Sequence, residues 1–560
     1  MRQSLEKIYG KEKAAVLIDR ISDLLNKYNG LKNKIKSDFS EKDVFLITYG
    51  DSIQKGGDAP LNTLKTFADI FLKNVFTTIH LLPFYPYSSD DGFSVIDFQA
   101  VNPVLGGWRN IAALNEHFGL MMDYVLNHIS AKSGWFDAFL SEKRGFENLA
   151  ITYPPETDLS IVTRPRTHPL LTPFQKKDGE TIYVWTTFSE DQIDLNWADP
   201  DVFLRMIDVL LLYVKHGADA IRMDAIAYLW KKYGTTCIHL SETHEMVKLI
   251  RKILDEVAPY VMIITETNVP HDENISYFGN GRDEAQAVYN FTLPPLLLYT
   301  FLKEDARYLS DWAKTLTTPS DKTTFFNFTA SHDGIGVRPL EGILSSDEIA
   351  DIVKSVTDNG GLVSYKNNPD GSKSPYELNI TYVDAMGREN DDPLKSVRFL
   401  SSQAVQFSLP GIPAVYILSL LGGGNWLEGV QETGRARTIN REKPDFDNIM
   451  TDINNPKSFR ARVFYPYIHM IRVRKSCKAF HPNASFNILN IGKEVFAIRR
   501  GDGSDSVYCF TNVTSKKVCI DLKCVDLLSK PLMDMISGVE VKGDSFILAP
   551  CSFVWLTEKG

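Results

Sequence analysis

The sequence of 560 residues has few features that would link it to a membrane, a nucleic acid or an export pathway. Its longest apolar stretches, Val209–Val214 and Phe291–Leu302, are too short to cross a bilayer, and the second contains two prolines. No long basic run interrupts the mild acidic excess, a net charge of -9, which argues against a nucleic-acid surface. Residues 1–15 lack the apolar segment of a secretory signal. We therefore expect a soluble, cytoplasmic protein that acts on small molecules.

Cysteine is also scarce. The six cysteines form no CxxC pair and have no histidine spacing typical of a metal site. We interpret them as reduced thiols, as is usual in the cytosol. Since no Asp-rich loop typical of calcium binding is present either, the sequence predicts no metal.

Short β-branched runs alternate with amphipathic helical stretches along most of the chain. Eight such runs follow a helical region: Val44–Tyr49, Thr77–Phe84, Leu120–His128, Ala218–Ile226, Val261–Asn268, Ala287–Phe291, Thr323–Ala330 and a short run within Val405–Ile417. This alternation predicts an α/β fold with parallel strands and helices outside. Because acid or His residues end several runs, we favour a (β/α)8 TIM barrel with its site at the carboxyl ends of the strands. The alternative is a doubly wound open sheet, which would gather its site at one switch point.

Two connections are too long for ordinary barrel loops, at about residues 131–200 and 337–400. We expect both to be loop-inserted subdomains that shape access to the substrate. The barrel with these insertions is placed at residues 43–480, behind an N-terminal helical cover at residues 1–42. Short alternating runs then predict a C-terminal all-β domain at residues 481–560.

The fourth run carries two opposite charges, Arg222 and Asp224. In a buried parallel strand alternate residues point the same way, so both side chains should emerge together near the strand's end. The guanidinium would then hold Asp224 ionised, as a nucleophile requires. A purely structural ion pair in the core is the alternative interpretation.

Four fragments occur in order on the third, fourth, fifth and seventh predicted strands: DYVLNH (123–128), IRMDAIAY (221–228), ITET (264–267) and TASHD (329–333). Together they resemble the four signature regions of the α-amylase superfamily, glycoside hydrolase family 13, and the resemblance runs from about residue 43 to the C-terminus. The fragments DDGFSVID, NHISAKSGWF, TRPR, LPPLLL and RTINR look like the sucrose phosphorylase branch. Within that branch, TETNVP and KNNPDGSKSPYELN are similar to the glucosylglycerate phosphorylase group.

The resemblance implies that Asp224 is the nucleophile, Glu266 the general acid/base and Asp333 the third carboxylate, which grips sugar hydroxyls. A retaining enzyme needs one ionised and one protonated carboxyl group, and the neighbouring acids should raise the pKa of Glu266. The residues that the resemblance implies around the glucosyl unit are Asp90, Phe93, His128, Phe188, Arg222, Tyr228, His332 and Arg437. For Asp123, Asn127 and His332, structural hydrogen bonds explain the residue type equally well.

Phosphorolysis requires an anion site, and guanidinium groups suit phosphate oxygens. TRPR supplies Arg164 and Arg166, of which the resemblance favours Arg166. Asn268 and Glu377 replace a His and a Gln of the sucrose-specific pattern, so recognition of the acceptor should differ. Both can bond the hydroxyl groups of a glycerate, whose carboxylate also needs a cation. Candidate cations are Lys366, Lys373 and Arg338.

The resemblance thus implies a retaining phosphorylase that converts 2-O-(α-D-glucosyl)-D-glycerate and phosphate into α-D-glucose 1-phosphate and D-glycerate by double displacement. Sucrose or sucrose 6'-phosphate phosphorolysis, or a retaining α-glucosidase or transglucosidase activity, are the alternatives. A noncatalytic scaffold would be expected to lose at least one of the three acids. We predict no cofactor, with inorganic phosphate as co-substrate. The expected partners are sugar and phosphate, without nucleic acid or membrane; a homodimer is compatible with the sequence, which does not reveal the oligomeric state.

Overall fold

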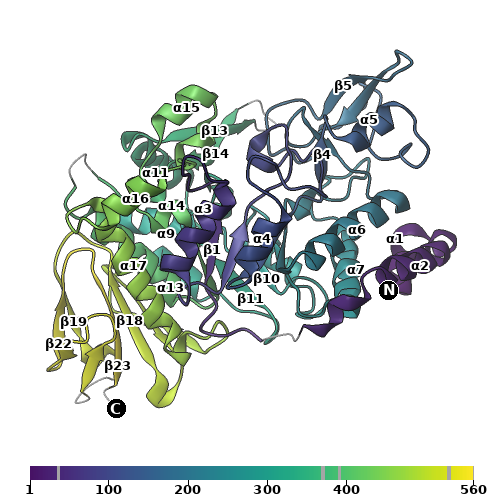
Figure 1. The fold of residues 1–560 in the computed structure, drawn as a ribbon. Helices are drawn as coiled ribbons and strands as arrows, with labels where there is room; N and C mark the ends of the chain where they lie inside the picture. Colours follow the sequence, from purple (N-terminus) through teal and green to yellow (C-terminus); the bar gives the residue numbers. More distant parts are fainter. Residues whose placement is uncertain (35–37, 368–371, 389–391, 526–530, 559–560) are drawn as a thin grey trace.

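Eight parallel strands close into a barrel at the centre of the molecule (Figure 1). The computed structural model describes residues 1–34, 38–367, 372–388, 392–525 and 531–558. In chain order the barrel strands are β1 (Phe45–Thr48), β2 (Thr78–Leu81), β3 (Gly119–Tyr124), β8 (Ala218–Met223), β9 (Met262–Thr265), β10 (Ala287–Tyr289), β11 (Thr324–Asn327) and β15 (Ile412–Tyr416). The strands neighbour one another in that order, and β15 closes the barrel on β1. The predicted (β/α)8 fold is confirmed.

The barrel strands are apolar on both faces because helices cover them outside while side chains fill the barrel inside. Every residue of β1, β11 and β15 is buried. The principal outer helices are α3 (Pro60–Phe67), α4 (Trp108–Asn115), α6 (Pro200–Lys215), α7 (Ser241–Val257), α9 (Leu293–Lys303), α10 (Arg307–Ala313), α13 (Lys395–Ser408) and α17 (Phe459–Lys475). The eighth predicted strand is shorter than its sequence range, since α13 continues to Ser408 and Pro410 separates it from β15.

Both long connections contain secondary structure of their own. The first holds β4 (His128–Ser130) paired with β7 (Gln192–Asp194), α5 (Gly134–Leu140) and a hairpin of β5 (Leu171–Gln175) and β6 (Thr181–Trp185). The second holds α11 (Ser346–Asp358) and a sheet of β12 (Ile335–Gly336), β14 (Lys373–Asn379) and β13 (Leu362–Asn367). Parts of the predicted regions lie outside the described residues: 35–37, 368–371, 389–391, 526–530 and 559–560.

The two ends of the chain pack on the barrel as helices and as sheets (Figure 1). At the N-terminus α1 (Arg2–Tyr9) and α2 (Lys11–Asn26) lie beside α7 and α6. The last strands form a six-stranded sheet of β16 (Phe486–Ile488), β17 (Val495–Arg500), β18 (Val507–Asn512), β23 (Phe553–Glu558), β20 (Leu532–Asp534) and β21 (Glu540–Val541), and a two-stranded sheet of β19 (Val518–Asp521) and β22 (Ser545–Leu548). Among the described helices, none has the length and apolar character needed to span a bilayer.

Candidate active site

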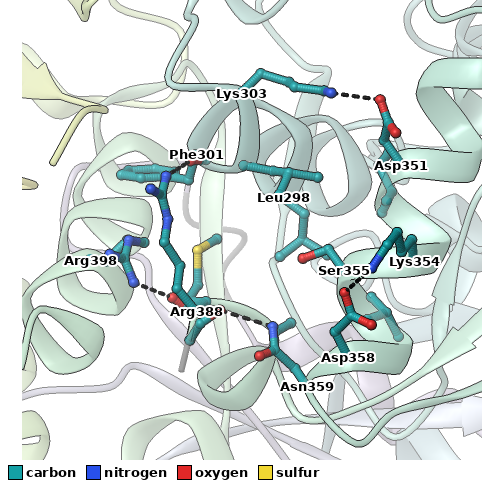
Figure 2. A pocket seen from close by; sticks show the side chains of 16 residues that line it. Leu298, Phe301, Lys303, Asp351, Lys354, Ser355, Asp358, Asn359, Arg388 and Arg398 are labelled. Carbon is teal, nitrogen blue, oxygen red and sulfur yellow. Dashed lines mark hydrogen bonds and ion pairs between the residues drawn. The ribbon is translucent and has the colours of Figure 1, made fainter. Parts of the chain in front are cut away.

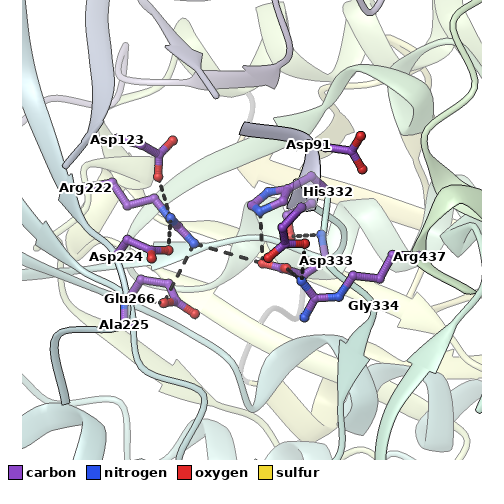
Figure 3. A network of polar contacts seen from close by, with 12 residues as sticks. Asp91, Asp123, Arg222, Asp224, Ala225, Glu266, His332, Asp333, Gly334 and Arg437 are labelled. Carbon is purple, nitrogen blue, oxygen red and sulfur yellow. Dashed lines mark hydrogen bonds and ion pairs between the residues drawn. The ribbon is translucent and has the colours of Figure 1, made fainter. Parts of the chain in front are cut away.

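The residues predicted to act on the substrate lie together in one pocket at the carboxyl ends of the barrel strands (Figure 3). Asp224 follows β8 directly, Glu266 follows β9 directly, and Asp333 lies in the loop after β11. The pocket has a volume of about 90 Å³. The three predicted catalytic acids and most of the predicted substrate-binding residues line it: Asp90, Phe93, His128, Arg166, Phe188, Arg222, Asp224, Tyr228, Glu266, Asn268, His332, Asp333, Glu377 and Arg437.

A buried guanidinium, that of Arg222, lies at the centre of the acids. Its Nη1 donates to Oδ1 of Asp224 at 2.7 Å and to Asp123 on the neighbouring strand β3. Its Nη2 lies 3.8 Å from Glu266 and 4.0 Å from Asp333. Phe93 and Tyr289 present their rings to it at 5.6 and 5.5 Å. The positive charge of Arg222 is therefore shared among four carboxylates.

Because of this sharing, Arg222 acts less strongly on Asp224 than the sequence led us to expect. Burial raises the pKa of Asp224 well above its ordinary value, and the charges of Glu266 and Asp123 add to the rise against the opposing effect of Arg222. Asp123 differs, because Arg222 and His80 outweigh its burial and lower its pKa. The guanidinium is thus partly neutralised by an acid that lies outside the pocket.

Glu266 has the environment expected of a general acid. Burial raises its pKa, and Asp333 adds to the rise while Arg222 opposes it. Its Oε2 accepts a hydrogen bond of 2.9 Å from the backbone N–H of Ala225. Ala225 has a φ of 49°, a left-handed conformation that is uncommon for a residue with a side chain. The chain therefore turns sharply after Asp224 and directs this N–H toward the acid on the next strand.

A second cluster closes the far edge of the pocket around Arg437 (Figure 3). Arg437 lies 2.9 Å from Asp333 and 4.0 Å from Asp90, and it holds Glu377 through two contacts of 2.9 and 3.1 Å. His332 approaches Asp333 to 3.4 Å, and burial with nearby Arg441 lowers the pKa of this imidazole well below its usual value. His332 is therefore neutral at physiological pH.

Aromatic rings form the walls. Phe93 stacks on His332 with ring centroids 4.7 Å apart. Phe188, from the first insertion, lies 5.3 Å from His128 and 5.4 Å from Tyr228. These rings offer apolar faces to a sugar ring, while polar groups converge from the barrel side.

Residues of both insertions meet at one side of the pocket, where the sequence predicts the acceptor to bind. Arg166 lies 3.8 Å from Glu377 and faces the Tyr376 ring at 5.6 Å. Glu377 is 3% exposed and accepts from the N–H of Gly334 at 2.8 Å, so it is not an ordinary surface carboxylate. A Cβ on Gly336 would lie 2.3 Å from the Asn268 side chain, so a glycine there allows the close approach.

Several residues considered for the site lie elsewhere. Arg164 donates to the carbonyl oxygen of His168, Arg338 pairs with Glu273 at 3.2 Å, and Lys366 pairs with Glu341 at 3.3 Å. Neither these three nor Lys373 lines the pocket. Asp123 and Asn127 also lie behind its wall, in structural hydrogen bonds.

Sequence reasoning missed several lining residues. Gln192 bonds Asp90 at 3.3 Å and the carbonyl of Phe93 at 3.3 Å, and Tyr376 underlies Arg166. Tyr376 could have been found, because it precedes Glu377 in the quoted PYELN segment. Gln192 carried no signal, since a lone glutamine in a long insertion suggests only a polar surface.

A cavity of about 370 Å³ between α9 and α11 is larger than the pocket with the acids (Figure 2). Four of its charged side chains pair with one another, Lys303 with Asp351 and Lys354 with Asp358, each at 2.5 Å. Arg388 donates to the carbonyl of Phe301 at 2.9 Å. We take the smaller pocket as the functional site because three acids that follow barrel strands, Asp224, Glu266 and Asp333, line it together. In the described part of the chain, no group of three or more His, Cys, Asp or Glu residues is arranged to hold a metal ion.

Comparisons with known proteins agree with this geometry. Residues 71–335 match the family model of the α-amylase catalytic domain. The chain is 45% identical to the glucosylglycerate phosphorylase of Escherichia coli strain K12 over 99% of its own length and 98% of that protein. It is 47% identical to that of Spirochaeta thermophila, over 94% and 90% of the two chains. The crystal structure of sucrose 6F-phosphate phosphorylase from Thermoanaerobacter thermosaccharolyticum superposes with a TM-score of 0.75 at 26% identity, over 92% of this chain and 99% of that one. The chain therefore belongs to the glucosylglycerate phosphorylase family of enzymes with an α-amylase catalytic domain.

Proposed function

We propose that this protein catalyses the reversible phosphorolysis of 2-O-(α-D-glucosyl)-D-glycerate to α-D-glucose 1-phosphate and D-glycerate, with retention of configuration. The observation that carries the proposal is the 45–47% identity to glucosylglycerate phosphorylases over nearly the whole chain. The pocket supports it, because the acids, the arginines and the residues that differ from the sucrose-specific pattern all line the same space.

In the first step Asp224 attacks the anomeric carbon and forms a glucosyl ester. Glu266 gives its proton to the departing glycerate oxygen, for which its raised pKa is suited. Arg437 and Asp90 hold the far hydroxyl groups of the glucosyl unit, and Asp333 binds hydroxyl groups more tightly as the ring flattens in the transition state.

In the second step phosphate replaces glycerate in the pocket and its oxygen attacks the anomeric carbon. The ester bond to Asp224 breaks, which frees the carboxylate, and Glu266 accepts the proton of the attacking oxygen. Glycerate and phosphate are both anions that occupy the acceptor side in turn. The guanidinium of Arg166 lines this side beside Glu377 and binds both anions in the proposal. Arg166 thereby takes the role that the sequence left open between Lys366, Lys373 and Arg338. Asn268 and Glu377 bond the glycerate hydroxyl groups.

No cofactor enters this chemistry, and phosphate is the co-substrate. The partners in the proposal are therefore the disaccharide and phosphate alone, and the proposed location is the cytoplasm.

The test is phosphate release from α-D-glucose 1-phosphate with D-glycerate, fructose, fructose 6-phosphate, glycerol or water as acceptor. We expect release to require D-glycerate. Release with water alone would make the protein a hydrolase, and release with fructose alone would assign it to sucrose.

An Arg166→Ala variant tests the shared anion site. Its KM values for phosphate and for D-glycerate should both rise about 10-fold or more, as expected for the loss of a charge-assisted hydrogen bond. Hydrolysis of α-D-glucosyl fluoride, which involves neither anion, should stay within about twofold of wild type. Arg164→Ala, an exposed arginine of the same loop, is the matched control.

A further inference from the structure

A chain of buried polar side chains continues from the acids into the barrel interior. Asp123 accepts from Arg222 through Oδ1 and from His80 through Oδ2, the latter at 2.8 Å. His80 belongs to β2 and is fully buried. Its Nδ1 lies 3.4 Å from the hydroxyl of Tyr289 on β10, on the opposite side of the closed barrel. This series of hydrogen-bonded side chains therefore crosses the barrel just below the pocket.

The partners fix the tautomer of His80. An ionised carboxylate only accepts hydrogen bonds, so Nε2 carries the proton toward Asp123. Nδ1 is then an acceptor, which the Tyr289 hydroxyl satisfies. Burial lowers the pKa of His80, so the imidazole stays neutral and does not compete with Arg222 for the charge of Asp123.

Tyr289 has two contacts in this network. Its hydroxyl bonds His80, and its ring lies 5.5 Å from the Arg222 guanidinium. Arg222 thus lies over the rings of Phe93 and Tyr289, and its Nη1 bonds both Asp123 and Asp224. The strength of the contact between Arg222 and Asp224 therefore depends on how strongly Asp123 attracts the same guanidinium. The charged and titratable groups that face Arg222 from the surrounding elements are Asp123, Asp224, Glu266, Asp333, His332 and Tyr289.

We propose that His80, oriented by Tyr289, is a positioning residue that satisfies Asp123 and thereby leaves Arg222 available to the nucleophile Asp224. Without the His80 hydrogen bond, the second oxygen of Asp123 is buried and unpaired. Asp123 can regain a partner only by turning onto Arg222, which weakens the contact between Arg222 and Asp224. The inference rests on the proposed double displacement only in that Asp224 must be ionised to react.

The test compares His80→Phe, His80→Gln and Tyr289→Phe by the pH dependence of kcat/KM. His80→Phe should lower kcat/KM about 10- to 100-fold, the equivalent of one buried hydrogen bond. Its acid limb should move to higher pH by roughly one unit, since a weaker Arg222 contact makes Asp224 easier to protonate. His80→Gln keeps an amide donor and should restore most of the rate and the acid limb. Tyr289→Phe keeps the ring and loses only the hydroxyl, so its shift should have the same sign and be smaller.

The Asp123→Asn variant should shift the acid limb of kcat/KM in the opposite direction. The charge of Asp123 contributes to the raised pKa of Asp224, so removing that charge should lower the pKa of Asp224. The acid limb of the variant should therefore move to lower pH. Acid limbs that coincide with wild type in all folded variants, as checked by thermal unfolding, would overturn the inference.

All variants are also assayed by fluoride release from α-D-glucosyl fluoride, which reports glucosylation with water as the sole acceptor. A wild-type protein that cleaves the fluoride but not glucosylglycerate would refute the proposed substrate and leave the test of His80 intact.

Discussion

At the scale of single residues, Asp224 and Glu266 are chemically similar and have different tasks. Asp224→Asn removes the nucleophile, so turnover should fall roughly 10⁴-fold or more with every glucosyl donor. Glu266→Gln removes the proton donor, so it should fail with glucosylglycerate yet still react with α-D-glucosyl fluoride, whose leaving group needs no proton. The measurement is first-turnover release of fluoride, because the second step still uses Glu266 as a base, together with steady-state turnover of glucosylglycerate. A fluoride rate that recovers in Asp224→Asn rather than in Glu266→Gln would exchange the two assignments.

The pH dependence follows from the shifts of the same pair. The active form has Asp224 ionised and Glu266 protonated, and the pKa of each is raised. As the pH falls, Asp224 gains its proton at a higher pH than the ordinary value of about 3.9. As the pH rises, Glu266 keeps its proton beyond the ordinary value of about 4.3. A plot of kcat/KM against pH should therefore be bell-shaped, with limbs that belong to the coupled pair. An acid limb at or below about pH 4 would contradict the burial of Asp224.

Strand position and the family resemblance together predicted that Asp224 and Glu266 lie at the same end of the barrel, since each directly follows a barrel strand, and their catalytic roles stay a prediction. The pKa of Asp224 did not follow from the sequence, since Asp123 and Asp224 come together on Arg222 only in the folded barrel. His80 itself gave no signal, because a lone histidine in an apolar strand is usually a satisfied core residue.

At the scale of elements, a buried lysine holds the first insertion against the barrel. Lys231 lies 2.5 Å from both Asp194 of β7 and Asn127, and it donates to the carbonyl of Tyr228 at 2.6 Å. Asp194 also accepts two hydrogen bonds of 2.7 Å from Thr187, next to the wall residue Phe188. The insertion and the pocket wall are thus tied at one point.

Lys231→Met should therefore destabilise the protein by about 3–5 kcal/mol, because Asp194 is left buried without its cation. The free energy of unfolding in urea measures this loss, and limited proteolysis should show faster cleavage within residues 131–200. The matched control is Lys232→Met, which removes a neighbouring lysine with 59% side-chain exposure. Adding Asp194→Asn to Lys231→Met should recover part of the loss, and no recovery would show that the charge of Asp194 is not its cause.

The elements themselves were largely predictable, since each barrel strand coincides with an apolar run. The eighth strand was less sharply defined, because the apolar run from Val405 continues through the end of α13 before β15 begins. Periodicity does not separate a buried helix end from a buried strand. The pairing of β4 with β7 was beyond the sequence, because its partners are distant and each is only a few residues long.

At the scale of the whole molecule, the C-terminal sheet shares one apolar core with the barrel helices. The inner face of β17 contributes Phe496 and Ile498 to the main core, while Val495 and Ala497 belong to a separate outer cluster. Phe480, which follows α17, packs on Trp555 of β23 with ring centroids 4.8 Å apart. Alternation along the last strands predicted a sheet, yet it did not reveal which face meets the barrel, because both faces are apolar.

This shared core predicts that the catalytic barrel depends on the C-terminal sheet. Ile498→Ala should cost about 2–5 kcal/mol and lower the temperature at which activity is lost, since the cavity lies between sheet and barrel. Ile520→Ala makes the same deletion at an equally buried site of the outer cluster, which does not join the main core. Its effect on the inactivation temperature should be smaller, although it should destabilise the C-terminal sheets themselves to a similar extent. Equal inactivation temperatures for the two variants would mean that the sheet and the barrel unfold as one body, with no distinct role for the interface.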